Sequence, residues 1–260
     1  MLPLIYLGSV SIPSYGICMA VGIVVACIVA HVRLKARGGT IDSLLLVAAV
    51  ALAIGLCFAK ISYYVFSYGV GRLISEVASG DFSGFTDAGL VYYGGLIGGI
   101  VGAYIAIKTA NYDFDDYVNA IVPCVPLGHA FGRVGCMLAG CCYGLHYNGV
   151  LAIHSAYVDP SETLFPIQAV ESFLNIILFA VLILFTKKKR NGMITLSVYL
   201  ILYSIIRFIL EFFRGDLIRG VYWGFSTSQW ISALLVIISV VVIVRFQKGQ
   251  QQSTTSVSNS

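Results

Sequence analysis

Charged residues are scarce in this sequence. Lys, Arg, Asp and Glu make up 11% of its 260 residues, whereas about 25% is typical of a soluble protein. This shortage excludes an ordinary soluble domain. Hydrophobic residues reach 58%, a fraction too high for intrinsic disorder. The net charge of +4 forms no basic face, so nucleic acid is not expected as a partner.

Proline is also scarce, with 6 residues against 27 glycines, and the apolar residues come in long blocks. A membrane-spanning helix needs about 20 mostly apolar residues. Seven segments meet this requirement, at residues 14–32, 43–68, 89–108, 117–136, 168–186, 192–213 and 229–246. Pro123 and Pro126 interrupt the fourth segment. The sequence therefore predicts an all-α membrane protein with a single seven-span domain over residues 1–246 and a disordered polar tail over residues 247–260.

The distribution of basic residues predicts the orientation of these spans. Three loops, which are every second loop starting with residues 32–42, and the C-terminal end together hold ten of the sixteen Lys and Arg residues. The alternate loops hold three. Basic residues concentrate in cytoplasmic loops. We therefore expect the N-terminus outside and the C-terminus, with its tail, in the cytoplasm.

Several polar side chains fall at the outer level of the predicted spans. Charges inside a span are costly and usually serve a function. Arg207, Glu211 and Arg214 are spaced i, i+4 and i+7, which predicts one shared helix face. The same level of the membrane includes Tyr15, Tyr92–Gly95, Arg133, Gln168 and Glu171.

The arginines at this level have two interpretations. Arginine at headgroup depth offers forked donors to a phosphodiester, so Arg133 and Arg207 predict a phosphate-binding site in which Glu211 holds the Arg207 guanidinium. Alternatively, Arg207 and Glu211 form a structural ion pair and Arg133 extends to the lipid headgroups. We favour phosphate binding, because the polar residues of several spans share one depth.

Glycines recur along the third predicted span. Gly94, Gly98 and Gly102, with Gly95 and Gly99, form overlapping G-x-x-x-G patterns, which are typical of close helix packing in membranes. Glycine also lets a ligand approach the backbone. The alternative interpretation is therefore that Gly94 and Gly95 line a binding site.

Three of the seven cysteines lie close together, in the segment Gly135–Gly144. The spacing of Cys136, Cys141 and Cys142 matches no pair of C-x-x-C metal knuckles, so no metal site is expected. A disulfide between Cys136 and Cys141 is one alternative, because the cluster faces outside. Reactive thiols are another, because Arg133 is near enough in sequence to lower a thiol pKa.

Taken together, these motifs resemble the prolipoprotein diacylglyceryl transferases, a family of bacterial membrane enzymes. The resemblance runs from about Leu7 to Trp230. It is carried by Ser14-Tyr15-Gly16, by Gly94-Gly95-Leu96-Ile97-Gly98, by Gly132-Arg133-Val134-Gly135-Cys136 through Gly144, by Phe165-Pro166-Ile167-Gln168 with Glu171, and by Arg207-Phe208 through Arg214 with Asp216.

The sequence also departs from the family pattern. Tyr93 stands where the family has a histidine. Cys136 and Ala139 replace its two signature asparagines, and Cys141 replaces its signature glutamate. The two arginines that the family uses for the phospholipid headgroup are retained, as is the tyrosine of the first span.

The resemblance implies transfer of a diacylglyceryl group from phosphatidylglycerol to the lipobox cysteine of a prolipoprotein signal peptide, with release of glycerol phosphate. No cofactor is implied. The expected site faces the extracytoplasmic side of the bacterial plasma membrane. Its expected catalytic residues are Arg207, Arg133 and Tyr93, and its expected substrate-binding residues are Tyr15, Gly94, Gly95, Gly144, Gln168, Glu211 and Arg214.

The departures keep two other functions open. The chain could use the same lipid donor with another acceptor and with its cysteines in catalysis. It could also be a non-catalytic lipid-binding or redox-sensing membrane protein. The retained arginines and Glu211 argue against the second alternative.

Overall fold

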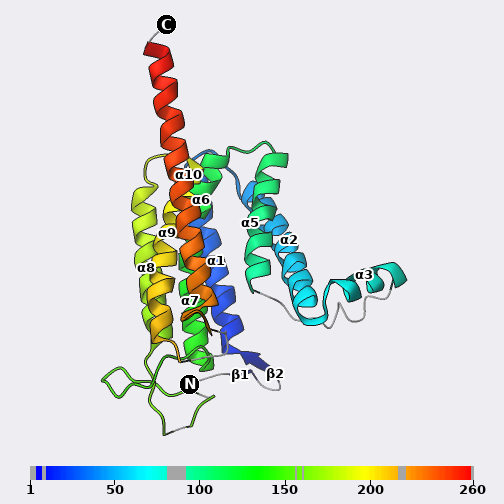
Figure 1. Cartoon of the computed structure of the whole chain (residues 1–260), viewed down its shortest axis with the longest axis vertical. Helices are drawn as coiled ribbons and strands as arrows, with labels where there is room; N and C mark the ends of the chain where they lie inside the picture. The colour runs from blue at the N-terminus through cyan, green and yellow to red at the C-terminus, as the bar shows by residue number, and fades with distance from the viewer. Residues whose placement is uncertain are drawn as a thin grey trace. The chain divides into compact units, whose positions relative to one another are not determined.

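Helices account for most of the chain, as its long apolar segments predict. The computed structural model describes residues 4–7, 10–80, 92–155, 157–159, 161–215 and 221–258 (Figure 1). The chain divides into two compact units, one made of Met1–Arg33 with Val118–Ser260 and the other of Leu34–Tyr117, where the sequence predicts one domain.

The first unit contains the N-terminal and C-terminal parts of the chain. Its helices are α1 (Ser14–Lys35, which ends just inside the second unit), α7 (Cys124–Ala139), α8 (Ile167–Phe185), α9 (Gly192–Leu210) and α10 (Thr227–Ser258). A 3-10 turn, Glu211–Phe213, follows α9. Two short antiparallel hairpins complete it, β1 (Leu4–Leu7) with β2 (Val10–Pro13) and β3 (Val221–Tyr222) with β4 (Phe225–Ser226).

The second unit is built on the packing of α2 (Ile41–Tyr68) against α5 (Tyr92–Thr109), with α3 (Val70–Ser79) between them in sequence. A Cβ atom added at Gly98 would lie 2.5 Å from the Phe58 Cβ, and one added at Gly102 would lie 2.8 Å from the Val50 carbonyl oxygen. The backbone of α5 therefore lies directly on α2, and helix packing explains the G-x-x-x-G pattern.

Six of the described helical segments are long and apolar enough to cross a membrane. They are Ser14–Lys35, Ile41–Tyr68, Phe114–Ala139, Ile167–Phe185, Gly192–Phe213 and Thr227–Lys248. The third span expected from the sequence corresponds to α5, whose apolar part within the described residues, Gly94–Thr109, is shorter. The chain is thus an all-α membrane protein with six candidate spans.

The fourth expected span is broken where its prolines predict. α6 (Phe114–Ile121), which begins in the second unit, is followed by a turn, and Pro123 then caps the start of α7. Proline has no backbone N–H to donate, so it is tolerated at the start of a helix but not in its interior. Together the two helices still form one of the six candidate spans, Phe114–Ala139.

α10 continues beyond its apolar segment to Ser258, whereas the sequence predicts a disordered tail from residue 247. Each residue added to an existing helix gains a backbone hydrogen bond without a new nucleation step. The stretch from 247 to 258 contains no proline to end the helix. Continuation of α10 is therefore consistent with its composition.

A buried polar network in the first unit is centred on Asn119. Asn119 is fully buried and donates from Nδ2 to the Arg190 carbonyl oxygen at 2.6 Å. Its own carbonyl oxygen accepts from Arg33 at 2.9 Å, and its Oδ1 accepts from the Thr195 hydroxyl at 2.9 Å. One residue thus links α1, α6 and α9 with the loop before α9.

Candidate functional site

Arg133 is the first charged residue of the site. It lies on α7, and its Nη2 is 2.9 Å from Oε1 of Glu171 on α8. One turn earlier, His129 accepts a hydrogen bond at its Nε2 from the Arg133 Nε at 3.2 Å. Because that ring nitrogen is an acceptor, His129 is neutral in this arrangement. Glu171 is 1% exposed, so the guanidinium is held inside the helix bundle.

Arg207 forms a second buried pair. Its Nη2 lies 2.7 Å from Oε2 of Glu211, one turn further along the chain, and donates to the Ser228 hydroxyl of α10 at 3.3 Å. The pairing predicted from the i, i+4 spacing is confirmed. Glu171 also interacts electrostatically with Arg207 and Arg214, so the two pairs belong to one cluster.

Arg214 does not share the helix face predicted for it. α9 ends at Leu210, the 3-10 turn follows, and Arg214 has extended backbone angles, φ −84° and ψ 137°. The 3-10 turn has 3.0 residues per turn rather than 3.6, so the i+7 periodicity ends with it. The Arg214 side chain is nevertheless buried, with 6% exposure, and reaches the same cluster.

Gly144 fixes the chain that passes over this cluster. It forms a bridge with Arg214, and the neighbouring Leu145 N–H donates to the Phe213 carbonyl oxygen at 3.0 Å. A Cβ atom added at Gly144 would lie 2.6 Å from the Phe165 carbonyl oxygen. Gly144, expected to bind substrate, therefore has a packing role that no other residue could fill without a shift.

Gln168 and Tyr15 take different positions around the cluster. Gln168 is 1% exposed and donates from Nε2 to the Cys141 carbonyl oxygen at 2.8 Å, so it anchors the cysteine segment on α8. Tyr15 lies in the first turn of α1 and is 43% exposed. A Cβ atom at Gly135 would lie 3.2 Å from the Tyr15 Cα, which shows that α1 meets α7 two residues after Arg133.

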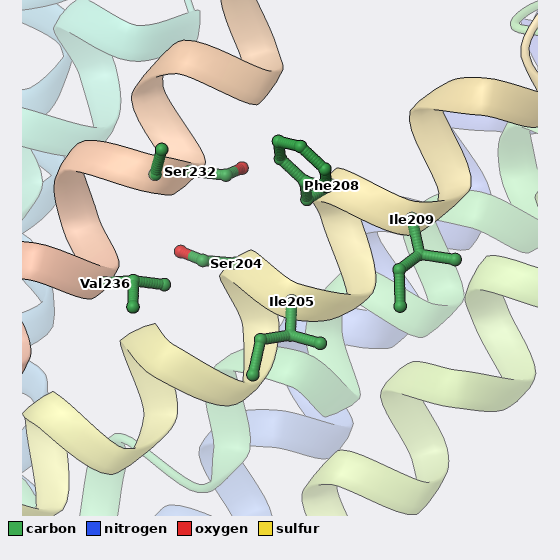
Figure 2. Close-up of a pocket in the computed structure, with 7 residues that line it drawn as sticks. Ser204, Ile205, Phe208, Ile209, Ser232 and Val236 are labelled. Atoms are coloured by element: carbon green, nitrogen blue, oxygen red, sulfur yellow. The ribbon is translucent and has the colours of Figure 1, made fainter.

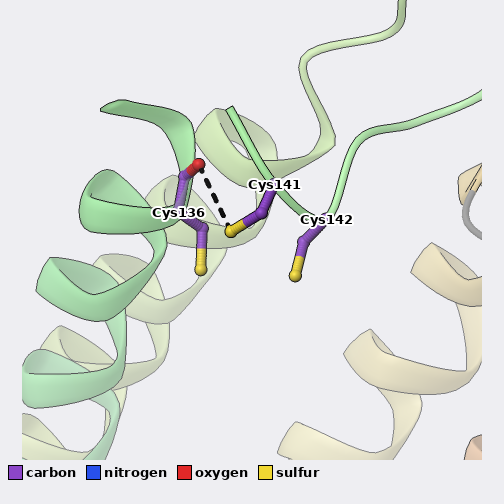
Figure 3. Close-up of side chains that lie close together, drawn as sticks. All are labelled: Cys136, Cys141 and Cys142. Carbon is purple, nitrogen blue, oxygen red and sulfur yellow. Dashed lines mark hydrogen bonds between the residues drawn. The ribbon is translucent and has the colours of Figure 1, made fainter. Parts of the chain in front are cut away.

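The three clustered cysteines converge at the end of α7 (Figure 3). Their sulfur atoms all lie within 4.8 Å of one another, and all three are thiols. The pKa of Cys142 is lowered from 9.0 to about 5, mainly because the Cys136 thiol hydrogen-bonds to it and also because Arg133 and Arg214 are near. Burial raises the pKa of Cys141.

The remaining expected site residues lie on α5 in the second unit. The Tyr93 side chain falls outside the described residues. A Cβ atom at Gly94 would lie 2.7 Å from the Phe58 carbonyl oxygen, and the Gly95 carbonyl oxygen would be 3.1 Å from a Cβ atom at Gly55. Contact with α2 accounts for both glycines within this unit.

An apolar pocket of about 140 Å³ opens between α9 and α10 (Figure 2). It is lined by Ser204, Ile205, Phe208, Ile209, Ser232, Ala233 and Val236. Arg207 donates to Ser228, which lies one turn of α10 before Ser232 in the pocket lining, so the pocket lies near the Arg207 end of the charged cluster. The combination provides a charged binding position beside an apolar one.

The chain that carries this charged cluster is similar to proteins of a known family. The sequence profile of the prolipoprotein diacylglyceryl transferases matches residues 3–245. The chain belongs to this family. It is 34% identical over 241 residues to a phosphatidylglycerol–prolipoprotein diacylglyceryl transferase of Clostridium tetani, with 90% of this chain and 94% of the relative covered.

Two further relatives have similar names and similar coverage. The phosphatidylglycerol–prolipoprotein diacylglyceryl transferase 2 of Clostridium perfringens is 30% identical over 244 residues, covering 92% of this chain and 93% of the relative. The corresponding transferase of Clostridioides difficile is 31% identical over 241 residues and covers 92% of each. The match therefore extends over almost the whole chain.

In this family member, sequence reasoning does not identify the partner of Arg133. It leaves Glu171 outside the expected set of site residues and gives His129 no contact with Arg133. A signal exists, because Gln168 and Glu171 are three residues apart and therefore share a face of α8. A buried face that presents an amide and a carboxylate requires polar partners on the neighbouring helix.

Proposed function

We propose that the chain transfers a diacylglyceryl group from phosphatidylglycerol to the lipobox cysteine thiol of a prolipoprotein and releases glycerol phosphate. The proposal places seven spans in the bacterial plasma membrane, with the N-terminus outside and the charged cluster toward the extracytoplasmic side. Membership of the transferase family supports the reaction. The gathering of three arginines in one buried cluster supports the assignment of the donor site.

Charge balance is the observation that carries this assignment. Arg133, Arg207 and Arg214 bring three positive charges, whereas Glu171 and Glu211 bring two negative ones. A buried cluster with excess positive charge favours an anionic ligand. A phosphodiester carries one negative charge and accepts forked hydrogen bonds from guanidinium groups. The pKa of Cys142 is lowered mainly by the Cys136 hydrogen bond and further by Arg133 and Arg214. Without a ligand its thiolate therefore offsets this excess charge, and a bound phosphate would compete with it for the arginines.

The reaction forms a carbon–sulfur bond and breaks a carbon–oxygen bond. The acceptor thiol loses its proton, its sulfur attacks the glyceryl carbon, and the phosphate ester leaves with the electron pair. Arg133 and Arg207 would stabilise the charge that develops on the leaving phosphate. Glu171 and Glu211 act as positioning residues, because each holds one guanidinium in a fixed orientation.

The pocket between α9 and α10 suits an acyl chain of the donor. Its walls are mainly apolar, and Ser232 in its lining is one turn of α10 after Ser228, to which Arg207 donates. A phospholipid held at Arg207 by its phosphate could therefore place one chain against Phe208 and Val236. Tyr15 and Tyr93 would contact the headgroup or the acceptor thiol. Tyr93 can hydrogen-bond there, but a phenol with a reference pKa of about 10 is a poor base at neutral pH.

The test uses the purified chain with phosphatidylglycerol and a synthetic signal peptide that contains Leu-Ala-Gly-Cys. We expect a gain of one diacylglyceryl mass on the peptide, lost in Arg207→Ala. Arg245→Ala is the matched control, because Arg245 is an exposed arginine of α10 and should keep full activity. Normal transfer by Arg207→Ala would disprove the assignment.

The same assay distinguishes the two alternatives. Binding of phosphatidylglycerol that requires Arg207, without any gain of peptide mass, would indicate a different acceptor. The replacement of family residues by Cys136, Ala139 and Cys141 favours this second candidate. Absence of both lipid turnover and peptide modification would indicate a non-catalytic lipid-binding protein.

A further inference from the structure

The three clustered cysteines form a site that the transfer reaction does not use. Their convergence begins with the way α7 ends. Gly140 has φ +79°, its N–H donates to the Met137 carbonyl oxygen, and the Cys141 N–H donates to the Cys136 carbonyl oxygen at 3.1 Å. These two bonds are the Schellman motif, which turns the chain back over the last helical turn. Cys141 is thereby placed beside Cys136, five residues earlier.

The backbone at Cys142 brings in the third sulfur. In an extended chain, successive side chains point to opposite sides. Cys142 instead has φ +59°, a left-handed conformation that is uncommon for residues other than glycine. The turn directs its sulfur to the same side as those of Cys136 and Cys141, as Figure 3 shows. An uncommon conformation of this kind is often found where a site requires it.

The segment that carries these thiols is held from two sides. Gln168 donates to the Cys141 carbonyl oxygen at 2.8 Å, and the buried hydroxyl of Ser155 donates to the Gly140 carbonyl oxygen at 2.7 Å. The next residues pair with the chain around Arg214. The three sulfur atoms are therefore positioned by the fold before any ligand binds, and Cys141 and Cys142 remain partly accessible.

The distances suit a metal ion. A metal–thiolate bond of about 2.3 Å places three sulfur atoms of a trigonal complex about 4.0 Å apart. The sulfur atoms lie within 4.8 Å of one another, so small side-chain rotations complete the arrangement. The sequence predicts no metal site here, because the spacing is not that of C-x-x-C knuckles. The Schellman turn and the left-handed Cys142 supply the proximity instead.

The number of ligands limits the metals that fit. Structural zinc sites almost always have four protein ligands, and a zinc ion with three protein ligands keeps a water in its fourth position. Iron–sulfur clusters are also held by four protein ligands. Within the part of the chain that the structure describes, the group contains three residues with metal-binding side chains. Soft thiolate ligands select copper(I), which accepts trigonal coordination.

We propose that Cys136, Cys141 and Cys142 form a three-thiolate site for copper(I). Binding forms three copper–sulfur bonds and releases to solvent the protons of those cysteines that are still thiols, with no change of oxidation state. The resulting complex carries two negative charges. Arg133 and Arg214, which already interact electrostatically with Cys142, offset them. This proposal does not depend on the acceptor or the reaction assigned above.

The experiment titrates copper(I) into the full-length, reduced protein without oxygen, in competition with a chromogenic copper(I) chelator. We expect one copper per chain, with three sulfur neighbours in its X-ray absorption spectrum. Cys142→Ser should weaken binding by more than the roughly 10–100-fold that is typical of losing a second-shell partner. Cys57→Ser, which removes an exposed cysteine of α2, should bind as the original chain does.

A second measurement needs no variant. Copper(I) should protect Cys136, Cys141 and Cys142 from alkylation while Cys57 stays reactive, as read from the masses of the digested peptides. Copper(I) affinity in Cys142→Ser equal to that of the original chain would overturn the proposal. So would a copper with only two sulfur neighbours, or equal protection of Cys57. Because transferase activity is not the readout, these results are independent of the proposed reaction.

Discussion

Replacing Glu171 by glutamine tests whether the arginine cluster is held ready for an anion. Glu171→Gln keeps the size of the side chain but removes the charge that lies 2.9 Å from the Arg133 guanidinium. Removal of one partner from a buried ion pair costs about 3–5 kcal/mol. Both partners are largely buried here, at 2% and 12% side-chain exposure, so the full range applies in the absence of a ligand.

An anionic lipid should restore part of this loss, because its phosphate supplies the missing charge. We expect Glu171→Gln to unfold at a lower temperature than the original chain in phosphatidylcholine micelles, by roughly 6–20 °C at about 2–4 °C per kcal/mol. Phosphatidylglycerol should narrow that difference. The rate of transfer should stay low, since Arg133 has lost the residue that orients it.

The matched control is Glu162→Gln, which removes the charge of an exposed glutamate in the segment between α7 and α8. Its unfolding should change by less than about 0.5 kcal/mol in either lipid. Equal unfolding temperatures for Glu171→Gln and the original chain in both lipids would refute the reasoning. That result would mean that Arg133 carries no buried charge in need of compensation.

Three further predictions concern other parts of the chain. Asn119→Leu removes two side-chain hydrogen bonds and should lower the free energy of unfolding by about 2–4 kcal/mol, measured by thermal unfolding, with transfer by the folded fraction unchanged. Gly98→Leu should prevent close packing of α2 on α5 and reduce the yield of folded protein, whereas Gly71→Leu, at an open position, should not. In reduced, metal-free protein, Cys142 should be alkylated with a pH midpoint near its pKa of about 5. Phosphatidylglycerol should raise that midpoint, because a nearby anion disfavours the thiolate.

Much of the fold follows from hydropathy and from the positions of proline and glycine. The apolar segments identify the candidate spans, and Pro123 marks the break between α6 and α7. The limits of periodicity appear at Arg214. A helical spacing rule cannot foresee that α9 tightens into a 3-10 turn after Leu210, because that ending is set by packing of the following chain against Gly144.

The site was predictable in its positive charges but not in their partners. Arg207 and Glu211 are one turn apart, so their pairing follows from the sequence alone. Arg133 and Glu171 are 38 residues apart, and only the packing of α7 on α8 brings them together. The cysteine cluster could be predicted only in part. Its Gly140 signals a helix end, but the left-handed conformation of Cys142 has no signal in the sequence.

The two proposals for this site are linked by charge. The phosphate of the donor lipid and the copper–thiolate complex are both anionic, and both proposals use Arg133, the phosphate together with Arg207 and the copper complex together with Arg214. Two anions that share the same cations weaken each other's binding, and the factor must be identical in both directions. Copper(I) bound at Cys136, Cys141 and Cys142 should therefore raise the Kd for phosphatidylglycerol by the factor by which the lipid raises the Kd for copper. The family departures at these cysteines would in this way act on the donor lipid without altering the arginines that hold it.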